Sequence, residues 1–442
     1  MKSKRKFVLA GLVLLARLTL AGCETEVEPK IQQPSGDGSG KTEPPKYIVE
    51  FNTDGGSAVD SQSVESGKVA TKPEDPSLKG SWFLGWYGDK ERTQEFDFSA
   101  PITVNTTVYA KWSYKLHTEP SILTNYTSPN NTGSEWTYVA FGDWPQRIKA
   151  GDVTVDETKS RKMGMFTYYL GSDGNCYVKA KENAYGFGSD YQYSDGTQAG
   201  QDETSEKWFK VEPIVWRVLT DDYCVPGENG ELQSTGNDLL LAENLLTGGI
   251  PYYVYVSSRT ISDATVYTNN YKYSTIRAWL NGRYESDDSQ ANKYAGKGFL
   301  QTAFTQSARD LIELTTVDNS AESTTDATGT LDEATDFACA NTTDKIFLLS
   351  EKEATTTSYG FAGFESGAGN TRIRVTTDYA KATGAYQSST EGYGGWWWLR
   401  SPHCDDEDIA RVIRNNGDAD FLHPYVSLTN GGVVPALCVQ LQ

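Results

Sequence analysis

The chain has 442 residues, a formal net charge of −19 at pH 7, 41 glycines and 12% aromatic residues. The negative charge argues against binding to nucleic acid or to an anionic membrane surface, because both would repel the protein. The glycine and aromatic content is typical of folded, turn-rich, strand-dominated domains, and the length allows two or three of them.

The N-terminus has the three parts of an export signal. Basic residues at positions 2–6 precede an apolar run from Phe7 to Ala21, which is too short and too interrupted for a stable membrane span. The next segment, Leu20-Ala21-Gly22-Cys23, resembles the lipobox of bacterial lipoproteins, although an ordinary signal peptide with an incidental cysteine is the alternative. The resemblance implies that residues 1–22 are removed and that Cys23 carries a lipid such as palmitate. We therefore expect export to the cell envelope, with the lipid anchored in the outer membrane or at the cell surface.

A tether and a small module come next. Residues 23–46 are rich in Pro, Gly, Ser and charge, so they cannot offset chain entropy by burial and are predicted to be a flexible tether. From Tyr47 to Phe51 the residues alternate like a half-buried strand, which ends at a turn over 52–56.

Residues 47–113 resemble a family of small modules. Phe51, Gly55-Gly56, Phe83-Gly85-Trp86-Tyr87 and Tyr109-Ala110-Lys111-Trp112 match the internalin B-repeat type of β-grasp module. The resemblance implies a spacer or adhesion module without chemistry. We expect Phe83, Trp86, Phe96 and Trp112 to pack in the core of a small sheet-and-helix domain, rather than to form a platform for carbohydrate.

A polar connector over 114–135 leads to a much larger domain, predicted to span 136–442. The segment 138–146 opens this domain. The expected elements are strands over 209–219 that break at Pro213, an apolar piece over 239–246, a helix within 273–282 that ends at Gly282, and a short helix over 307–314. A polar surface insertion over 318–343 and a buried strand over 344–350 follow. Alternation sends Trp396 and Trp398 to one face of a strand and Trp397 to the other, so one face is core and the other could line a ligand pocket.

The order of these landmarks resembles the domain of unknown function number 6273. The matching segments are 141–146 (FGDWPQ), 210–219 (KVEPIVWRVL), 274–281 (STIRAWLN), 344–350 (DKIFLLS), 397–402 (WWLRSP) and 432–437 (GVVPAL). Val434 stands where the family usually has Arg, which weakens the expectation of a buried arginine pair at this end. The closing pattern is also similar to the C-type-lectin fold of formylglycine-generating-enzyme-like domains, with 394–402 and 432–441 as scaffold strands. The resulting fold class is α+β and β-rich, with a small β-grasp domain followed by a C-type-lectin-like head.

The stretch between the two scaffold strands has an unusual composition. Of the types Lys, Glu, Gln, Trp and Met, residues 403–432 contain only Glu407. Codons that end in a pyrimidine cannot encode these five types. Diversity-generating retroelements replace adenines in AAC and AAT codons near the end of a gene, which produces the same restricted set, so the stretch resembles their targets. The alternative is an ordinary loop rich in Asp, Asn and Gly, which are common turn residues. We predict that this stretch is exposed and binds the ligand, through His403, Asp405, Asp406, Asp408, Arg411, Arg414, Asn415, Asn416, Asp418, Asp420, Phe421, His423 and Tyr425.

Signals of catalysis are weak. The three histidines, at 117, 403 and 423, accompany no GxSxG, HExxH or GxxxxGK[ST] motif. Cys404 and Cys438 could mimic the paired thiols of formylglycine-generating enzymes, but a disulfide or two buried thiols is favoured. The acidic run over 405–408 could bind calcium, but a solvated face is favoured. We assign no catalytic residue, metal or cofactor.

The expected function is that of a monomeric envelope lipoprotein. Its non-enzymatic head would bind a protein or glycan ligand outside the cell, and retroelement diversification of 403–432 would vary that ligand. The protein would contact the membrane only through its N-terminal lipid and would bind no nucleic acid. The alternatives are an envelope hydrolase or protein-modifying enzyme, and a structural envelope protein without a ligand.

Overall fold

The computed structural model describes residues 43–78, 81–130, 136–186, 191–227, 229–282, 291–326, 329, 332–363, 371–419 and 424–441. The predicted signal peptide, Cys23 and most of the tether lie outside these residues. Within the described part of the chain, no helix is both long and apolar enough to span a membrane.

The first module is a four-stranded sheet in the order β2-β1-β4-β3. Its strands are β1 (Lys46–Asn52), β2 (Gln62–Glu65), β3 (Phe83–Tyr87) and β4 (Thr106–Trp112), and β1 runs parallel to β4. Trp86 is buried, and Phe83, Phe96 and Trp112 pack partly buried against the same cluster, which confirms the core expected for these aromatics. The expected helix is wrong, because residues 43–78 and 81–112 contain none.

The polar connector is attached to the head. Its strand β5 (Ser121–Ile122) pairs with β6 (Tyr138–Ile148), and Asn130 donates to both the backbone and the side chain of Glu243. The described part of the connector, residues 114–130, is therefore bound to the larger domain rather than acting as a free spacer.

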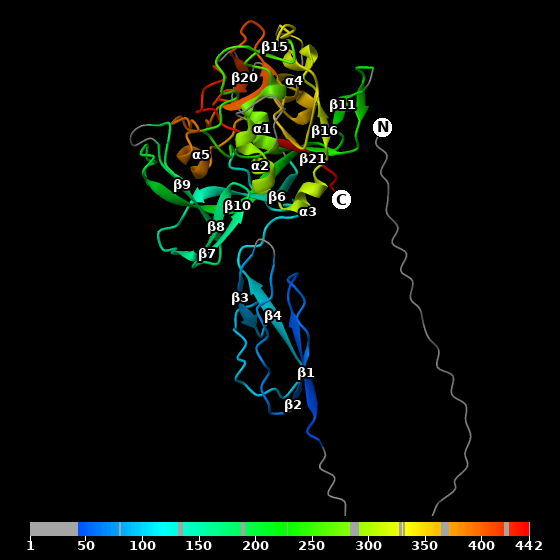
Figure 1. Cartoon of the computed structure of the whole chain (residues 1–442), viewed down its shortest axis with the longest axis vertical. Helices are drawn as coiled ribbons and strands as arrows, with labels where there is room; N and C mark the ends of the chain where they lie inside the picture. The colour runs from blue at the N-terminus through cyan, green and yellow to red at the C-terminus, as the bar shows by residue number, and fades with distance from the viewer. Residues whose placement is uncertain are drawn as a thin grey trace, which may run out of the picture. The chain divides into compact units, whose positions relative to one another are not determined.

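A nine-stranded sheet forms the frame of the head (Figure 1). Its main path is β18-β21-β13-β10-β9-β8-β7, and β6 pairs with β10. The strands are β7 (Val155–Met163), β8 (Phe166–Gly171), β9 (Cys176–Lys181), β10 (Glu206–Thr220), β13 (Asp238–Ala242), β18 (Ile346–Phe347) and β21 (Ala436–Val439). The break predicted at Pro213 is wrong: β10 continues through it, and a shift of register between Pro213 and Val215 accommodates the residue that cannot donate to the ladder.

The helices of the head are short. They are α1 (Thr275–Asn281), α2 (Phe299–Ala303), α3 (Gln306–Leu311), α4 (Glu351–Ala354) and α5 (Asp378–Ala382). The helix predicted within 273–282 is confirmed as α1, which begins after Ser274 and ends at Gly282. Ser274 caps α1 by accepting the Arg277 amide, and Gly282 takes the left-handed conformation with φ of 60°.

Four two-stranded sheets lie beside this frame. They pair β11 (Cys224–Pro226) with β12 (Leu232–Ser234), β14 (Arg259–Ile261) with β15 (Ala264–Val266), β16 (Thr315–Val317) with β17 (Thr342–Asp344), and β19 (Trp397–Pro402) with β20 (Ala410–Ile413). The segment over 318–343 is not a purely surface insertion, because residues 323–326 are buried.

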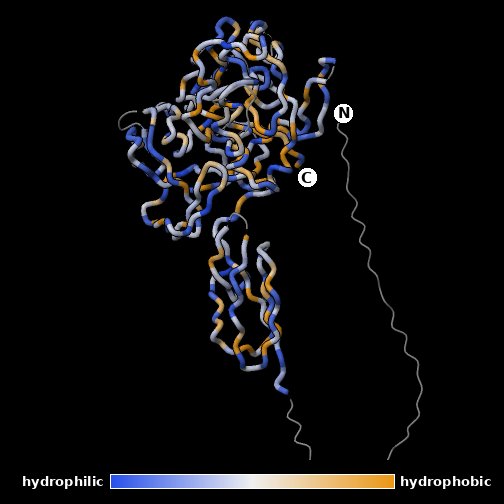
Figure 2. Tube along the Cα trace, in the orientation of Figure 1, coloured by the Kyte–Doolittle hydropathy of each residue, from blue (hydrophilic) through white to orange (hydrophobic). Residues whose placement is uncertain are grey.

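The hydrophobic residues of the head gather towards its centre (Figure 2). Trp396, Trp397 and Trp398 are all buried. The suggestion from the alternation that one face of this strand could line a ligand pocket is therefore wrong. The fold is β-rich with short helices, as expected. The β-grasp and C-type-lectin-like assignments stay predictions.

Candidate ligand-binding surface

The β19–β20 hairpin carries an acidic loop at one end of the head (Figure 1). Both strands are buried, and residues 403–409 connect them. Asn269 and Thr268, each fully buried, hold this loop from inside. The Asn269 side chain donates to the carbonyls of Asp406 (2.8 Å) and Ile409 (3.2 Å), and the Thr268 hydroxyl donates to that of Glu407 (2.6 Å). The loop carbonyls are thereby satisfied internally, which fixes the backbone and leaves Asp405 and Asp406 exposed.

Two further segments lie beside this loop. The amide of Val426 donates to the carbonyl of Asp408 (2.9 Å), and the amide of Tyr253 donates to the carbonyl of Val426 (2.9 Å). Ile409 also forms a bridge with Tyr425, so residues 408–409, 425–426 and 253 are neighbours.

Large apolar side chains are exposed on these neighbouring segments. Val256 is 73% exposed and Tyr425 56% exposed, and Val254 and Leu428 are also exposed. We call Asp405, Asp406, Tyr425, Leu428, Val254 and Val256 the display surface. It combines two carboxylates with four apolar or aromatic side chains.

The residues predicted to bind the ligand differ in how exposed their side chains are. Asp405, Asp406 and Tyr425 are exposed, while Asp408, Arg414, Asn415, Asn416 and Asp418 are half-buried. Asp420, Phe421 and His423 lie outside the described residues. Residues 414–418 form a separate turn, closed by the Arg414 amide donating to the Asp418 carbonyl (2.9 Å).

The expectation that the whole stretch is exposed is wrong at His403 and Arg411, which are 2% and 3% exposed. Arg411 lies beneath the loop, with its Nε 3.2 Å from a carboxylate oxygen of the buried Glu351, and its Nη2 donates to the Cys404 sulfur at 3.5 Å. A guanidinium held between a buried carboxylate and a thiol supports the loop and cannot meet a ligand at the surface.

Burial shifts the pKa of both groups that Arg411 contacts. Burial raises the pKa of Glu351 to about 8, although Arg411 acts in the opposite direction, and neither oxygen of this carboxyl has a hydrogen-bond partner among the described residues. Burial also raises the pKa of the Cys404 thiol, again against Arg411. The five described cysteines, Cys176, Cys224, Cys339, Cys404 and Cys438, are free thiols.

Sequence reasoning missed Val254, Val256 and Leu428. Residues 250–256 read IPYYVYV, a run that on its own is typical of a buried strand. In the structure both valines are exposed, although the run also contains the fully buried Tyr252 and Tyr253, so the local pattern did not indicate which side chains reach the surface.

A separate cavity of about 980 Å³ lies between the β11–β12 hairpin and α4. Its lining includes Glu353, whose carboxylate accepts from Arg400 Nη1 (2.5 Å) and Nη2 (3.0 Å) and from the Tyr223 hydroxyl (2.5 Å). Burial would raise the pKa of Glu353, but Arg400 and Tyr223 outweigh it and hold the pKa below its ordinary value. Because both oxygens of this carboxylate already accept hydrogen bonds and its pKa is lowered, it is poorly suited to donate a proton as a general acid.

Comparison with known proteins identifies two domains. Residues 47–111 match the Listeria-Bacteroides repeat domain, and residues 235–441 match the domain of unknown function DUF6273. The chain therefore contains both domains, although the DUF6273 match starts at residue 235 and does not include the segments at 141–146 and 210–219 that were also expected to belong to it.

Two proteins of Evansella cellulosilytica share short stretches with the chain. One, named "Putative membrane protein", is 41% identical over 76 residues, which cover 16% of this chain and 11% of the relative. The other, named "Putative Gly-rich membrane protein", is 37% identical over 73 residues, which cover 16% of this chain and 8% of the relative. The similarity thus spans about a tenth of each relative. Together with the repeat domain, these relatives fit a protein of the cell envelope.

Proposed function

We propose that this chain is a cell-envelope lipoprotein, anchored through Cys23, whose head binds a ligand outside the cell without catalysing a reaction. The observation that carries the proposal is the display surface, where exposed apolar side chains adjoin an acidic loop that buried residues hold in place. Exposed large apolar side chains on segments that pair with a polar loop are a feature of many interaction sites. The tether and the repeat domain would serve as a spacer, in a β-grasp fold, between membrane and head.

The chemistry of the display surface favours a polypeptide ligand. Asp405 and Asp406 would attract basic side chains, while Tyr425 and Val256 would bury apolar ones, and interfaces commonly combine an apolar centre with a charged rim. A neutral glycan could stack on Tyr425 but would leave the two carboxylates without a charged partner. We therefore place a protein ligand with basic and apolar groups ahead of a glycan.

The test uses the full-length protein in detergent, with phage-displayed peptides and a glycan array as probes. Binders selected on the wild type are measured against Tyr425→Ser and Asp406→Lys, with Tyr185→Ser as the matched control because Tyr185 is 48% exposed and lies outside the display surface. We expect basic, apolar peptides whose affinity falls at least tenfold in the first two variants and is unchanged in the control, since both sites lie at the proposed contact. Equal binding to all four proteins, or binders that are only glycans, would contradict the proposal.

We also propose that diversification, if encoded, is confined to the exposed positions of 403–432. Replacement of Arg411 would remove a buried side chain that contacts Glu351 and Cys404, whereas Asp406 and Tyr425 have exposed side chains that can change with less effect on the buried frame. The deciding observation is the gene neighbourhood. A near-copy of the last coding stretch beside a reverse transcriptase, with substituted adenines in the codons of the exposed residues, supports diversification, and the absence of both removes it.

A further inference from the structure

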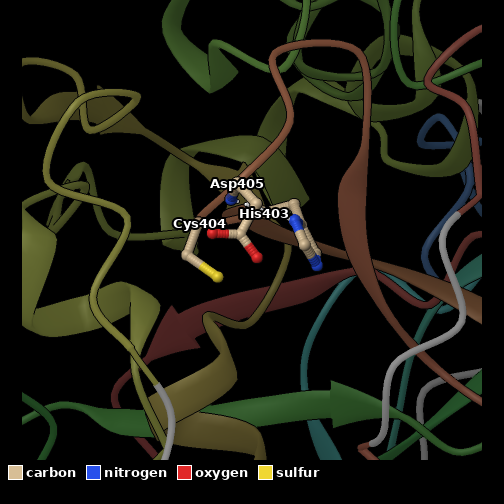
Figure 3. A group of neighbouring side chains, drawn as sticks. All are labelled: His403, Cys404 and Asp405. Atoms are coloured by element: carbon tan, nitrogen blue, oxygen red, sulfur yellow. Dashed lines mark hydrogen bonds between the residues drawn. The ribbon is translucent and has the colours of Figure 1, made fainter.

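Three metal-ligating side chains converge at the start of the acidic loop (Figure 3). His403, Cys404 and Asp405 each offer one ligand atom, and these atoms all lie within 4.8 Å of one another. In the view of Figure 3 the Asp405 carboxylate lies between the Cys404 thiol and the His403 ring. Consecutive residues usually send their side chains in different directions, so this convergence needs a local cause.

The backbone of the loop supplies that cause. His403 is still tied to the hairpin, because its amide donates to the carbonyl of Ile409 at 3.1 Å. The chain then turns sharply, and the amide of Asp405 donates back to Nδ1 of His403 at 3.1 Å. This turn brings residues 403 and 405 to the same side of residue 404.

We propose that His403, Cys404 and Asp405 form a binding site for a divalent transition metal of the zinc type. An imidazole nitrogen, a thiolate sulfur and a carboxylate oxygen are ligands that Zn²⁺ and Co²⁺ accept together, whereas Ca²⁺ and Mg²⁺ require oxygen ligands. The inference does not depend on the ligand-binding role of the head.

The spacing of the ligand atoms is close to what such a metal requires. Bonds of about 2.0–2.3 Å in a tetrahedral arrangement place neighbouring ligand atoms about 3.3–3.6 Å apart. Side-chain rotation must therefore bring the most distant pair together by roughly 1 Å, from the present limit of 4.8 Å. Since Asp405 is exposed, water or an external ligand can reach the fourth position.

Arg411 and Glu351 form the second layer of the site. Arg411 donates to the Cys404 sulfur at 3.5 Å, and donors of this kind orient metal-bound ligands and tune the metal. Arg411 also lies 3.2 Å from the buried Glu351, which holds the guanidinium beneath the loop. Because Nδ1 of His403 accepts from the Asp405 amide, the neutral ring carries its proton on Nε2. Coordination through either ring nitrogen must therefore release this hydrogen bond: Nδ1 cannot bind a metal and accept from the amide with the same lone pair, and Nε2 can bind only after the ring proton has moved to Nδ1.

The test is a titration of the reduced full-length protein with Co²⁺, whose bonds to thiolate give a charge-transfer absorption band in the near ultraviolet. We expect one cobalt ion per chain, a band that Zn²⁺ abolishes by displacement, and no band in Cys404→Ser. Cys224→Ser is the matched control, because Cys224 is also a partly exposed free thiol. Its band should be unchanged.

Asp405→Asn guards against misfolding of the cysteine variant, because Asp405 is exposed and its replacement should leave the fold intact. We expect its cobalt affinity to fall about tenfold or more, the size of effect typical when a coordination shell is altered. A band that persists in Cys404→Ser, an unchanged affinity in Asp405→Asn, or binding of Ca²⁺ in place of Co²⁺ would each overturn the proposal.

Discussion

The ion pair between Arg217 and Glu243 gives the sharpest test of how the head is held together. Both side chains are fully buried. Arg217 donates from Nε and Nη2 to the two oxygens of Glu243, at 2.9 and 2.7 Å, and from Nη1 to the carbonyl of Thr371 at 2.7 Å. Replacement of Arg217 by Met removes all three donors and leaves the carboxylate with Asn130 and Ser128 as its remaining hydrogen-bond donors among the described residues.

The expected loss of stability follows from these contacts. Removal of one member of a buried ion pair typically costs about 3–5 kcal/mol, because the other charge is left in a medium of low dielectric constant. Arg374 also lowers the pKa of Glu243 and remains in place, so we expect the lower end of this range, about 3 kcal/mol. For a domain of this size that corresponds to a fall in Tm of roughly 6–12 °C.

The loss should also depend on pH. Burial would raise the pKa of Glu243, but Arg374 and Arg217 outweigh it and hold the pKa below the ordinary value of 4.5. The ion pair therefore contributes its full stability above pH 4.5, and this contribution is lost as the pH falls through the lower folded-state pKa. The difference between wild type and Arg217→Met should be largest near pH 7 and should shrink in acid.

The assay is urea unfolding followed by tryptophan fluorescence, at several pH values. The matched control is Arg147→Met, because Arg147 makes the same two-pronged contact with Glu212 but is 63% exposed. An exposed pair of this kind contributes less than about 1 kcal/mol. If Arg217→Met costs no more than Arg147→Met, or if its cost is the same at pH 4 and pH 7, the reasoning from burial is refuted.

Three further variants test other parts of the head. Gly142→Ala should cost about 3 kcal/mol in urea unfolding, because φ is 72° and the added carbon would lie 2.5 Å from the Phe304 ring; a loss under about 1 kcal/mol would show that the ring moves aside. Tyr223→Phe should cost about 1–2 kcal/mol by removing a donor to Glu353, and an unchanged Tm would contradict the importance of that contact. Glu351→Gln should flatten the pH dependence of stability. Burial raises the pKa of Glu351 from 4.5 to about 8, so the stability associated with its neutral form is full below pH 4.5 and lost as the pH rises through about 8; the same slope in the variant would refute this.

Local signals were enough to predict α1 and the core of the repeat domain. Ser274 and Gly282 mark the ends of α1 through interactions within a few residues. Trp86 could be predicted as buried because a small domain needs its largest apolar side chains for its core. By contrast, the continuity of β10 through Pro213 depends on its partner β6, which lies far away in the sequence. Register shifts of this kind are set by tertiary pairing and leave no local mark.

The candidate site could be predicted only in part for the same reason. Composition drew attention to 403–432, and the loop residues Asp405 and Asp406 are exposed as expected. Arg411 belongs to the same polar stretch but is buried, because Glu351 of α4 lies beneath it. A count of residue types cannot distinguish an arginine that faces solvent from one that faces a buried carboxylate.

The buried arginines explain how a head with so many loops can hold a surface in place. Arg217, Arg372, Arg374 and Arg400 are among its largest fully buried side chains. Each donates to backbone carbonyls, as Arg372 does to Gly417 (2.7 Å) and Arg400 to Leu348 (2.7 Å). Carbonyls in irregular segments have no ladder partner, and a guanidinium offers five N–H donors in a fixed plane, so one arginine can satisfy several of them.

Variants at the buried arginines and variants at exposed residues of the display surface should therefore have different effects. Arg217 and Arg400 stand in the segments WRVL and WWLRSP, which were predicted to form strands of the head rather than part of the ligand-binding stretch. Their side chains are buried and bonded to the frame, so their replacement can weaken binding only together with a loss of stability. Replacement of the exposed Tyr425 should weaken binding while the unfolding midpoint stays the same. Measuring both quantities for Arg400→Met and Tyr425→Ser separates the frame from the surface it carries, and a Tyr425 variant that loses both would place that side chain in the frame instead.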